Sequence, residues 1–152
     1  MSGARSRAAV ISGVGAVAPV RRSERTAIDM IVDAVRSALL DADVGADLVG
    51  GVVTESAITT GMAKPADVAA AVGLTGLATT AASSPTGAGI LQAVGLAAAL
   101  VEAGVADHVV SYFGVDWGTR RSGANDYHAA MDAKSVIERP AGFVGPPLYF
   151  AT

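Results

Sequence analysis

Two short apolar runs enclose a helix of small residues in the middle of the chain, and this order limits the folds that the chain can adopt. Residues 77–81 and 108–113 have the composition of buried strands. Residues 87–103 between them follow a helical pattern rich in alanine and glycine. A strand, a helix and a second strand in this order predict a βαβ crossover and parallel pairing.

The N-terminal half shows the same alternation. Residues 8–12 predict a buried strand that stops at Gly13 and Gly15. Residues 48–54 contain a second predicted strand, and we expect Gly50 and Gly51 to form the turn that leads into it. Repeated alternation of strands and helices indicates an α/β protein with a mostly parallel sheet.

Apolar side chains recur at helical spacing between these two strands. The stripe consists of Ile28, Ile31, Val32, Val35 and Leu39. We expect Ser23 to be the N-cap and the helix to end near Ala42. A shorter helix, capped by Asp67, is predicted to run through Val72.

A length of 152 residues predicts a single domain that spans residues 1–152. After Val115 the sequence becomes polar and loses its periodicity. We therefore expect an irregular excursion at about residues 116–147. Such a long irregular segment in a small domain is functional or braced by a partner.

Composition excludes several function classes. A net charge of −3 from 11 basic and 14 acidic residues provides no excess of positive charge for binding nucleic acid or anionic membranes. The absence of cysteine excludes disulfides and cysteine-ligated metals. No apolar run reaches the roughly 20 residues of a membrane span, so we expect a soluble, cytoplasmic protein. The mean hydropathy of +0.47 predicts apolar surface that meets another subunit or a missing half domain.

The turn before the central helix is the main candidate site. It joins a strand to a helix N-terminus, where unpaired N–H groups and the helix dipole favour a negatively charged oxygen. Such a place can stabilise the oxyanion of a thioester carbonyl. The predicted binding residues are Thr86, Gly87, Ala88 and Gly89. In the alternative interpretation Ser83, Ser84 and Thr86 only cap the helix, and the glycines only allow close packing.

Acid–base candidates are few. His128 beside Tyr127 is the predicted catalytic pair, because imidazole and phenol both exchange protons, although a surface histidine is the alternative. His108 at the start of a strand is expected to be a turn or edge residue. A hydroxyl such as that of Ser84 is a weak nucleophile without an activating base.

Cofactor signals are weak. Residues 13–18 match the letters of a dinucleotide fingerprint, but Pro19 delays the helix that such a site requires, so we expect no bound cofactor. Arg120 and Arg121 are candidates for CoA phosphate contacts or simply solvated arginines. Acidic residues and histidines do not cluster at ligand spacing, so no metal site is predicted.

Several of these motifs together resemble the thiolase superfamily. The residues that carry the resemblance are Thr79, Thr80, Gly87, Val94, Gly95, Ala97 and Ala98, followed by the turn Ala103, Gly104, Ala106 and Asp107. They are most similar to thiolase-like proteins related to the thiolase domain of sterol carrier protein x, a branch that includes retro-aldol lyases of CoA thioesters. The implied fold is a thiolase-like half domain, a mostly parallel mixed sheet with helices on both faces.

The resemblance also implies what this chain lacks. It places the family's reactive cysteine at or next to Gly87, and it covers only the first of two similar halves. The expected function is a thiolase-like component that handles acyl-CoA, in a retro-aldol lyase acting on a β-hydroxyacyl-CoA. The alternative is a non-catalytic or truncated subunit with a dimerisation role. The expected partners are further subunits in a homo- or hetero-oligomer, including a second thiolase-like half or a small oligonucleotide/oligosaccharide-binding-fold (OB-fold) protein.

Overall fold

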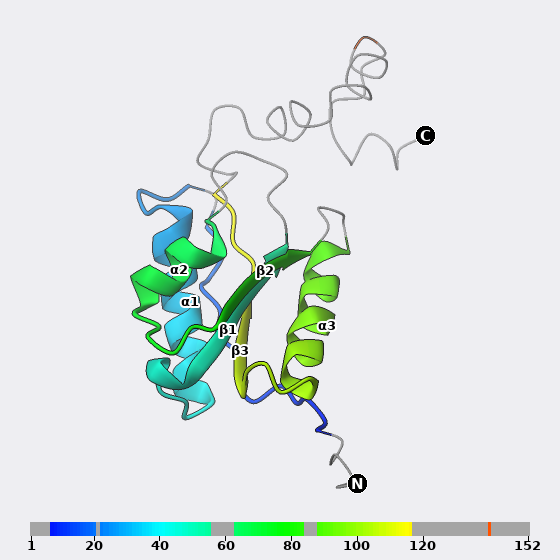
Figure 1. The fold of residues 1–152 in the computed structure, drawn as a ribbon. Coiled ribbons are helices and arrows are strands. Elements are labelled where there is room, and N and C mark those ends of the chain that lie inside the picture. Colours follow the sequence, from blue (N-terminus) through cyan, green and yellow to red (C-terminus); the bar gives the residue numbers. More distant parts are fainter. Residues whose placement is uncertain (1–6, 21, 56–62, 84–87, 117–139, 141–152) are drawn as a thin grey trace, which may run out of the picture.

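The chain is described by a computed structural model for residues 7–20, 22–55, 63–83, 88–116 and 140 (Figure 1). Within these residues, three parallel strands form one sheet in the order β2-β1-β3. The elements are α1 (Ala27–Asp41), the 3-10 helix η1 (Ala46–Leu48), β1 (Val49–Glu55), α2 (Pro65–Val72), β2 (Thr79–Ser83), α3 (Gly89–Glu102) and β3 (His108–Tyr112). This arrangement confirms the expected α/β fold class.

β1 is the central strand and is deeply buried. Val49, Val52 and Val53 have no exposed surface, and the backbone pairs in parallel with β2 on one side and β3 on the other. Gly51 lies inside this strand, where an added Cβ would sit 3.0 Å from Cγ2 of Val109. The predicted glycine turn before the strand is therefore wrong, because Gly50 and Gly51 belong to the strand itself.

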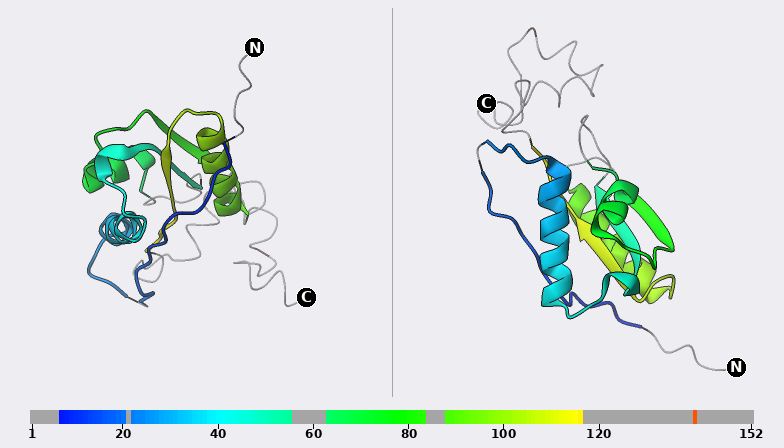
Figure 2. Two further views of the ribbon diagram at one scale, coloured as in Figure 1. Left: turned by 90° about the horizontal axis from the view of Figure 1, so that it is seen from below. Right: turned by 90° about the vertical axis from the view of Figure 1, so that its left-hand side faces the viewer.

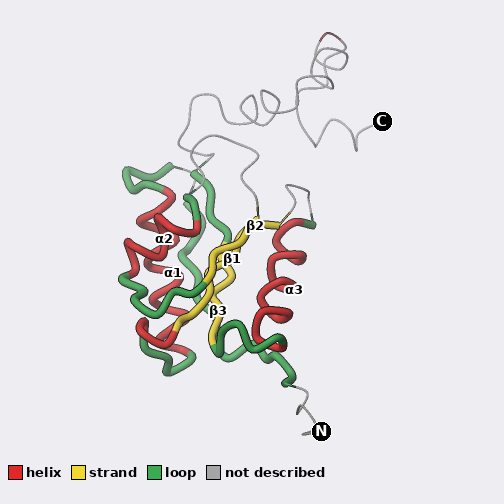
Figure 3. Tube along the Cα trace, viewed as in Figure 1, coloured by secondary structure: helices red, strands yellow, loops and turns green. Residues whose placement is uncertain are grey.

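Helices cover both faces of the sheet. α1 and α2 pack together on one face, and α3 lies on the other (Figures 1 and 3). The core between the sheet and the first pair of helices consists of Ile31, Val32, Val35, Val49, Val52, Val68, Ala69, Val72, Leu74 and Tyr112. On the opposite face the buried residues of α3 are Gly89 and Ala93. Their small size lets this helix approach the sheet closely.

The apolar stripe predicted for α1 is confirmed, but the helix begins after Thr26 and not after Ser23. Thr26 Oγ1 accepts a hydrogen bond from Asp29 N at 3.3 Å, and the Asp29 carboxylate accepts one from Thr26 N at 3.0 Å. This reciprocal capping box satisfies two backbone donors at once. The hydrogen bonds from Thr26 also hold the pKa of Asp29 below its ordinary value. Ser23 Oγ instead accepts from Arg25 N, ahead of the helix.

α2 also differs from the prediction at its start. Lys64 is the N-cap and Pro65 occupies the first helical position, so Asp67 lies in the first turn and does not cap the helix. Proline is favoured at this position because its missing N–H would have no partner there anyway. The predicted end at Val72 is confirmed, and Gly73 closes the helix in a left-handed conformation with φ 88°.

The predicted strand at residues 8–12 is wrong for the described part of the chain. These residues belong to a segment that we call the N-terminal arm (residues 7–20), which runs along α1 outside the sheet (Figure 2). Val10 is 82% exposed and Ile11 is 78% exposed. A strand pattern is stable only beside a pairing partner, and none of the described strands pairs with the arm.

The N-terminal arm is nevertheless held at defined points. A Cβ on Gly15 would overlap the carbonyl oxygen of Ala34 in α1, so only glycine allows this close approach. Val14 N donates to a carboxylate oxygen of Asp41 at 2.9 Å. Nearer the N-terminus, Arg7 forms an ion pair with Asp107 at 2.6 Å, just ahead of β3.

A buried polar pair ties β3 to its neighbours. Thr54 Oγ1 donates to the backbone oxygen of Tyr112 at 2.7 Å, and the Tyr112 hydroxyl donates to the backbone oxygen of Ala63. Burial raises the pKa of Tyr112 to about 12. The two hydrogen bonds fix the carboxyl end of β3 against β1 and against the chain that leads into α2.

Replacing Gly15 by alanine should destabilise the fold. The new methyl group meets backbone atoms of α1, so we expect Gly15→Ala to lower the free energy of unfolding by about 1–3 kcal/mol. Gly95→Ala is the matched control, because nothing lies within 4 Å of a Cβ at that position in α3. It should raise stability by about 0.5–1 kcal/mol. Urea denaturation measures the free energy of unfolding of both variants. An unchanged value for Gly15→Ala would contradict the close packing of the arm on α1.

Tyr112 should make stability fall at high pH. Its pKa is about 12 in the folded chain and near 10 when exposed. Below pH 10 Tyr112 is protonated in both the folded and the unfolded chain, and its contribution to the free energy of unfolding is fully present. As the pH rises through 10 towards 12, the unfolded chain loses its proton first and the folded state loses stability.

The Tyr112→Phe variant tests this linkage. It should be less stable below pH 10, by about 1 kcal/mol, because the oxygen of Ala63 loses its hydrogen bond. Above pH 10 its stability should fall less than that of the wild type. Denaturant unfolding across this pH range measures how the free energy of unfolding of each protein depends on pH. If the two proteins lost stability equally above pH 10, Tyr112 would not be the group responsible.

Candidate functional site

The carboxyl ends of the three strands meet at one edge of the sheet. From β1 the chain continues to α2 on one face, whereas from β2 it continues to α3 on the opposite face (Figure 1). Where neighbouring strands send their connections to opposite faces, a crevice opens between their carboxyl ends, and α/β proteins bind ligands there. The candidate site is therefore this topological switch point at the carboxyl ends of β1 and β2, which we call the crevice.

Glu55 and Ser83 end these two strands. They are direct partners in the parallel register, and Glu55 is partly buried. The crevice thus contains a carboxylate beside a hydroxyl. Glu55 is absent from the candidates identified in the sequence. The signal that could have identified Glu55 is its position directly after a run of β-branched residues that forms a buried strand.

The N-terminus of α3 lies beside the carboxyl end of β2. Ala88 is the N-cap residue, and no side chain among the described residues caps the helix. The first N–H groups of α3 therefore have no intrahelical partner and carry the positive end of the helix dipole. Ser83 Oγ donates to the backbone oxygen of Gly89 at 2.6 Å. This hydrogen bond holds the start of α3 beside the carboxyl end of β2.

The predicted oxyanion-binding residues are only partly described. Ala88 and Gly89 lie at the start of α3, as the sequence suggested. Thr86 and Gly87 lie outside the described residues, and so does Ser84. The oxyanion role of all four predicted residues stays a prediction. Among the described residues, Ser83 contacts the helix start, and it donates to a carbonyl instead of accepting from an N–H group.

The predicted catalytic pair Tyr127 and His128 lies outside the described residues. Arg120 and Arg121 do as well. His108 is the first residue of β3, at the opposite end of the sheet from the crevice, so the structure separates it from this site. Tyr112 keeps its proton because its pKa is raised, and its hydroxyl is committed to a backbone oxygen.

The glycine-rich run at residues 13–18 does not have the geometry of a dinucleotide site. Its glycines lie in the N-terminal arm and pack against the side of α1. A dinucleotide fingerprint needs a strand before the glycines and a helix directly after them. Here the next helix is α1, which begins only at Ala27, and residues 8–12 are not a strand.

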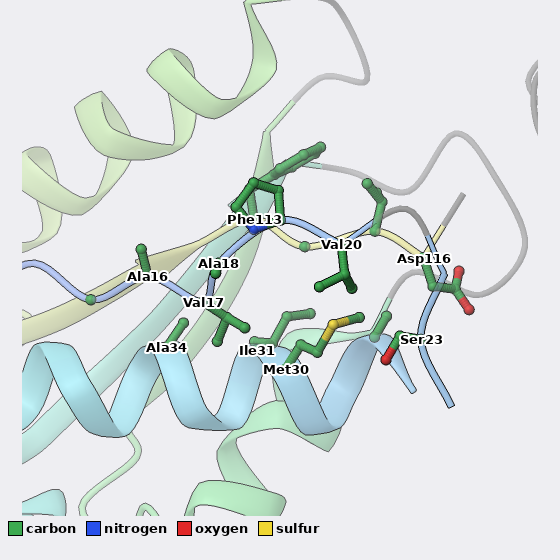
Figure 4. Close-up of a pocket in the computed structure, with 15 residues that line it drawn as sticks. Ala16, Val17, Ala18, Val20, Ser23, Met30, Ile31, Ala34, Phe113 and Asp116 are labelled. Carbon is green, nitrogen blue, oxygen red and sulfur yellow. The ribbon is translucent and has the colours of Figure 1, made fainter. Parts of the chain in front are cut away.

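A separate cavity of about 310 Å³ lies on the β3 side of the sheet (Figure 4). Residues 15–20 of the arm form one wall and residues 113–116 form another. Met30, Ile31 and Ala34 of α1 lie along its floor. The lining is mostly apolar, and no residue of the crevice between β1 and β2 contributes to it.

The described residues contain no group of three acidic, histidine or cysteine side chains that is arranged to hold a metal ion. None of their helices combines the length and the apolar character that crossing a membrane requires.

Comparison with known proteins gives an informative likeness to a solved structure. No family model matches the chain, and no curated protein matches it. Among solved structures, the chain is similar to an Ltp2-ChsH2(DUF35) aldolase, with a TM-score of 0.68 and 29% identity over 82% of this chain. The match spans 32% of that aldolase chain. The α/β fold of this chain is therefore similar to a portion of that aldolase, whose whole chain is about three times as long as the matched region.

Proposed function

We propose that this chain is a thiolase-like component of a carbon–carbon lyase that handles acyl-CoA and cleaves a β-hydroxyacyl-CoA by a retro-aldol reaction. The observation that carries the proposal is the likeness to an aldolase over 82% of the chain. Because the chain spans 32% of that aldolase, the activity of the whole aldolase comes to this chain only as part of the proposal. The groups at the crevice between β1 and β2 provide the oxyanion stabilisation and the proton transfer of the proposed reaction.

The start of α3 is suited to the enolate that a retro-aldol cleavage generates. Its first N–H groups, which have no partner within the helix, and the helix dipole stabilise negative charge on the thioester oxygen. Retro-aldol cleavage needs this stabilisation and a proton transfer, but it forms no acyl-enzyme. The absence of cysteine from the chain is compatible with this reaction and not with a cysteine-dependent thiolase.

In the proposed mechanism Glu55 transfers the proton. Its carboxylate takes the proton of the β-hydroxyl group, and the bond between the α and β carbons breaks as the carbonyl of the first product forms. The released electron pair becomes the enolate of the thioester at the N-terminus of α3. The carboxylic acid then returns its proton to the α carbon, which yields an acyl-CoA. Tyr127 and His128 remain candidates for assisting these transfers.

Companion subunits complete the proposed assembly. The outward side of α3 is apolar, with Leu91 73% exposed and Val94 40% exposed, and a helix that is apolar all round is normally buried. We propose that a second thiolase-like half covers this face and that a small OB-fold partner joins the assembly. The same face favours the alternative function, a non-catalytic subunit whose role is dimerisation.

The reaction itself is the first test. The chain, purified together with its companion subunits, should convert a β-hydroxyacyl-CoA into an acyl-CoA and a free carbonyl compound. Mass spectrometry of the quenched reaction measures both products. A complete assembly that cleaves none of a panel of aliphatic, aromatic and steroidal β-hydroxyacyl-CoA esters would leave the dimerisation role as the better account.

Replacing Glu55 tests the proton transfer. We expect Glu55→Gln to lower kcat by about 10²–10⁴-fold, because the amide cannot accept the proton. Glu55→Asp should retain part of the rate, because a carboxylate remains to accept the proton. Glu102→Gln is the matched control, since this exposed glutamate lies at the other end of α3. Equal rates for the Glu55→Gln and control assemblies would remove Glu55 from the mechanism.

A further inference from the structure

We propose that Ser83 is a positioning residue, which holds the first turn of α3 in a fixed place relative to Glu55. The role rests on the proposed function, because it concerns the same thioester oxygen and the same proton transfer. Ser83 itself takes no part in making or breaking bonds. Its hydroxyl connects the strands that carry the base to the helix that carries the N–H donors.

Glu55 and Ser83 lie on the face of the sheet that α3 covers. Side chains alternate between the two faces along a strand. Val52 belongs to the core formed with α1 and α2, so Glu55, three positions later, points to the opposite face. Ser83 is the direct partner of Glu55 in the parallel register and therefore shares this face. The register thus places the hydroxyl beside the base, under the start of α3.

A hydrogen bond from Ser83 reaches the first turn of α3. Its hydroxyl donates to the backbone oxygen of Gly89 at 2.6 Å, in a partly buried position. Gly89 is the first residue of α3 and is itself buried. Because this oxygen belongs to the first helical turn, the hydrogen bond ties that turn to the end of β2. The N–H groups of the turn are held in place with it.

The first turn of α3 is weak without this support. Ala88 is the N-cap, and no side chain among the described residues caps the helix, although a capping side chain normally stabilises this end. Gly89 follows, and glycine loses more backbone freedom in a helix than any other residue. Oxyanion donors act only if they are fixed before the charge develops. A misplacement of about 1 Å costs about a hundredfold in rate, so a frayed first turn would be a poor oxyanion site.

The direction of the hydrogen bond leaves Glu55 available to the substrate. A hydroxyl has one proton to donate, and that of Ser83 goes to the oxygen of Gly89. Ser83 therefore cannot donate to the Glu55 carboxylate at the same time, and the carboxylate keeps its acceptor capacity for the β-hydroxyl group. Nor is Ser83 activated as a nucleophile, because a backbone carbonyl is not a base that removes the proton.

Steady-state kinetics of the assembly test this role. The assembly is purified with its companion subunits and with the chain carrying Ser83→Ala, Ser83→Thr or the control Thr80→Ala, which removes an exposed hydroxyl from the opposite face of β2. We expect Ser83→Ala to lower kcat about 10–100-fold and to change KM less than about threefold, because the displaced N–H groups act on the transition state. Ser83→Thr keeps the hydroxyl and should restore most of kcat. Thr80→Ala should leave both constants unchanged.

The outcomes separate this role from the proposed function. A wild-type assembly that cleaves no β-hydroxyacyl-CoA would overturn both. An active wild-type assembly with equal kcat for Ser83→Ala and Thr80→Ala would overturn the positioning role alone. The same holds if Ser83→Thr is as slow as Ser83→Ala, because the hydroxyl would then not be the group that matters. A raised KM with unchanged kcat would also overturn it.

Amide hydrogen exchange of the chain alone tests the hydrogen bond without any reaction. Gln92 N donates to Ala88 O at 3.1 Å and closes the first turn of α3, whereas Ala103 N donates to Ala99 O at 2.9 Å at the other end. We expect Ser83→Ala to accelerate exchange at Gln92 about tenfold and to leave Ala103 unchanged. Unchanged exchange at Gln92 would contradict the role. Equal acceleration at both amides would show that the hydroxyl supports the whole fold and not the first turn, which would also overturn it.

Discussion

Burial of β1 between two layers of helices is the interaction on which the rest of the structure depends. Its valines are fully enclosed, and its backbone bonds to a strand on each side. Burial of apolar area contributes about 25 cal/mol per Å², and this strand brings together side chains from α1, α2 and both neighbouring strands. Without it, β2 and β3 would have no partner among the described residues.

The position of the candidate site follows from this central strand. Because β1 connects to α2 on one face and β2 connects to α3 on the other, the crevice lies where the two strands end. Glu55 and Ser83 are brought together by strand register, and the hydrogen bond from Ser83 to Gly89 adds the start of α3. A carboxylate and a helix N-terminus therefore lie at the ends of two neighbouring strands, and these are the two groups that the proposed retro-aldol cleavage needs.

The sequence predicted what depends on local pattern. The apolar stripe of α1, the existence of β1, β2 and β3, and the helix α3 all follow from periodicity within single segments. Errors arose where a distant residue decides the outcome. Gly51 is a strand residue because Val109 lies beside it, and residues 8–12 are not a strand because no described strand pairs with them. Glu55 gains its candidate role only through its register with Ser83, which no local pattern contains.

A structure of the purified assembly with a bound, uncleaved acyl-CoA analogue would test the central claim most directly. The account predicts that the thioester oxygen lies within about 2.7–3.2 Å of N–H groups in the first turn of α3. It also predicts that the Glu55 carboxylate faces the β carbon of the acyl group. A thioester bound elsewhere, for example in the cavity between the N-terminal arm and residues 113–116, would contradict the assignment of the crevice as the site of chemistry.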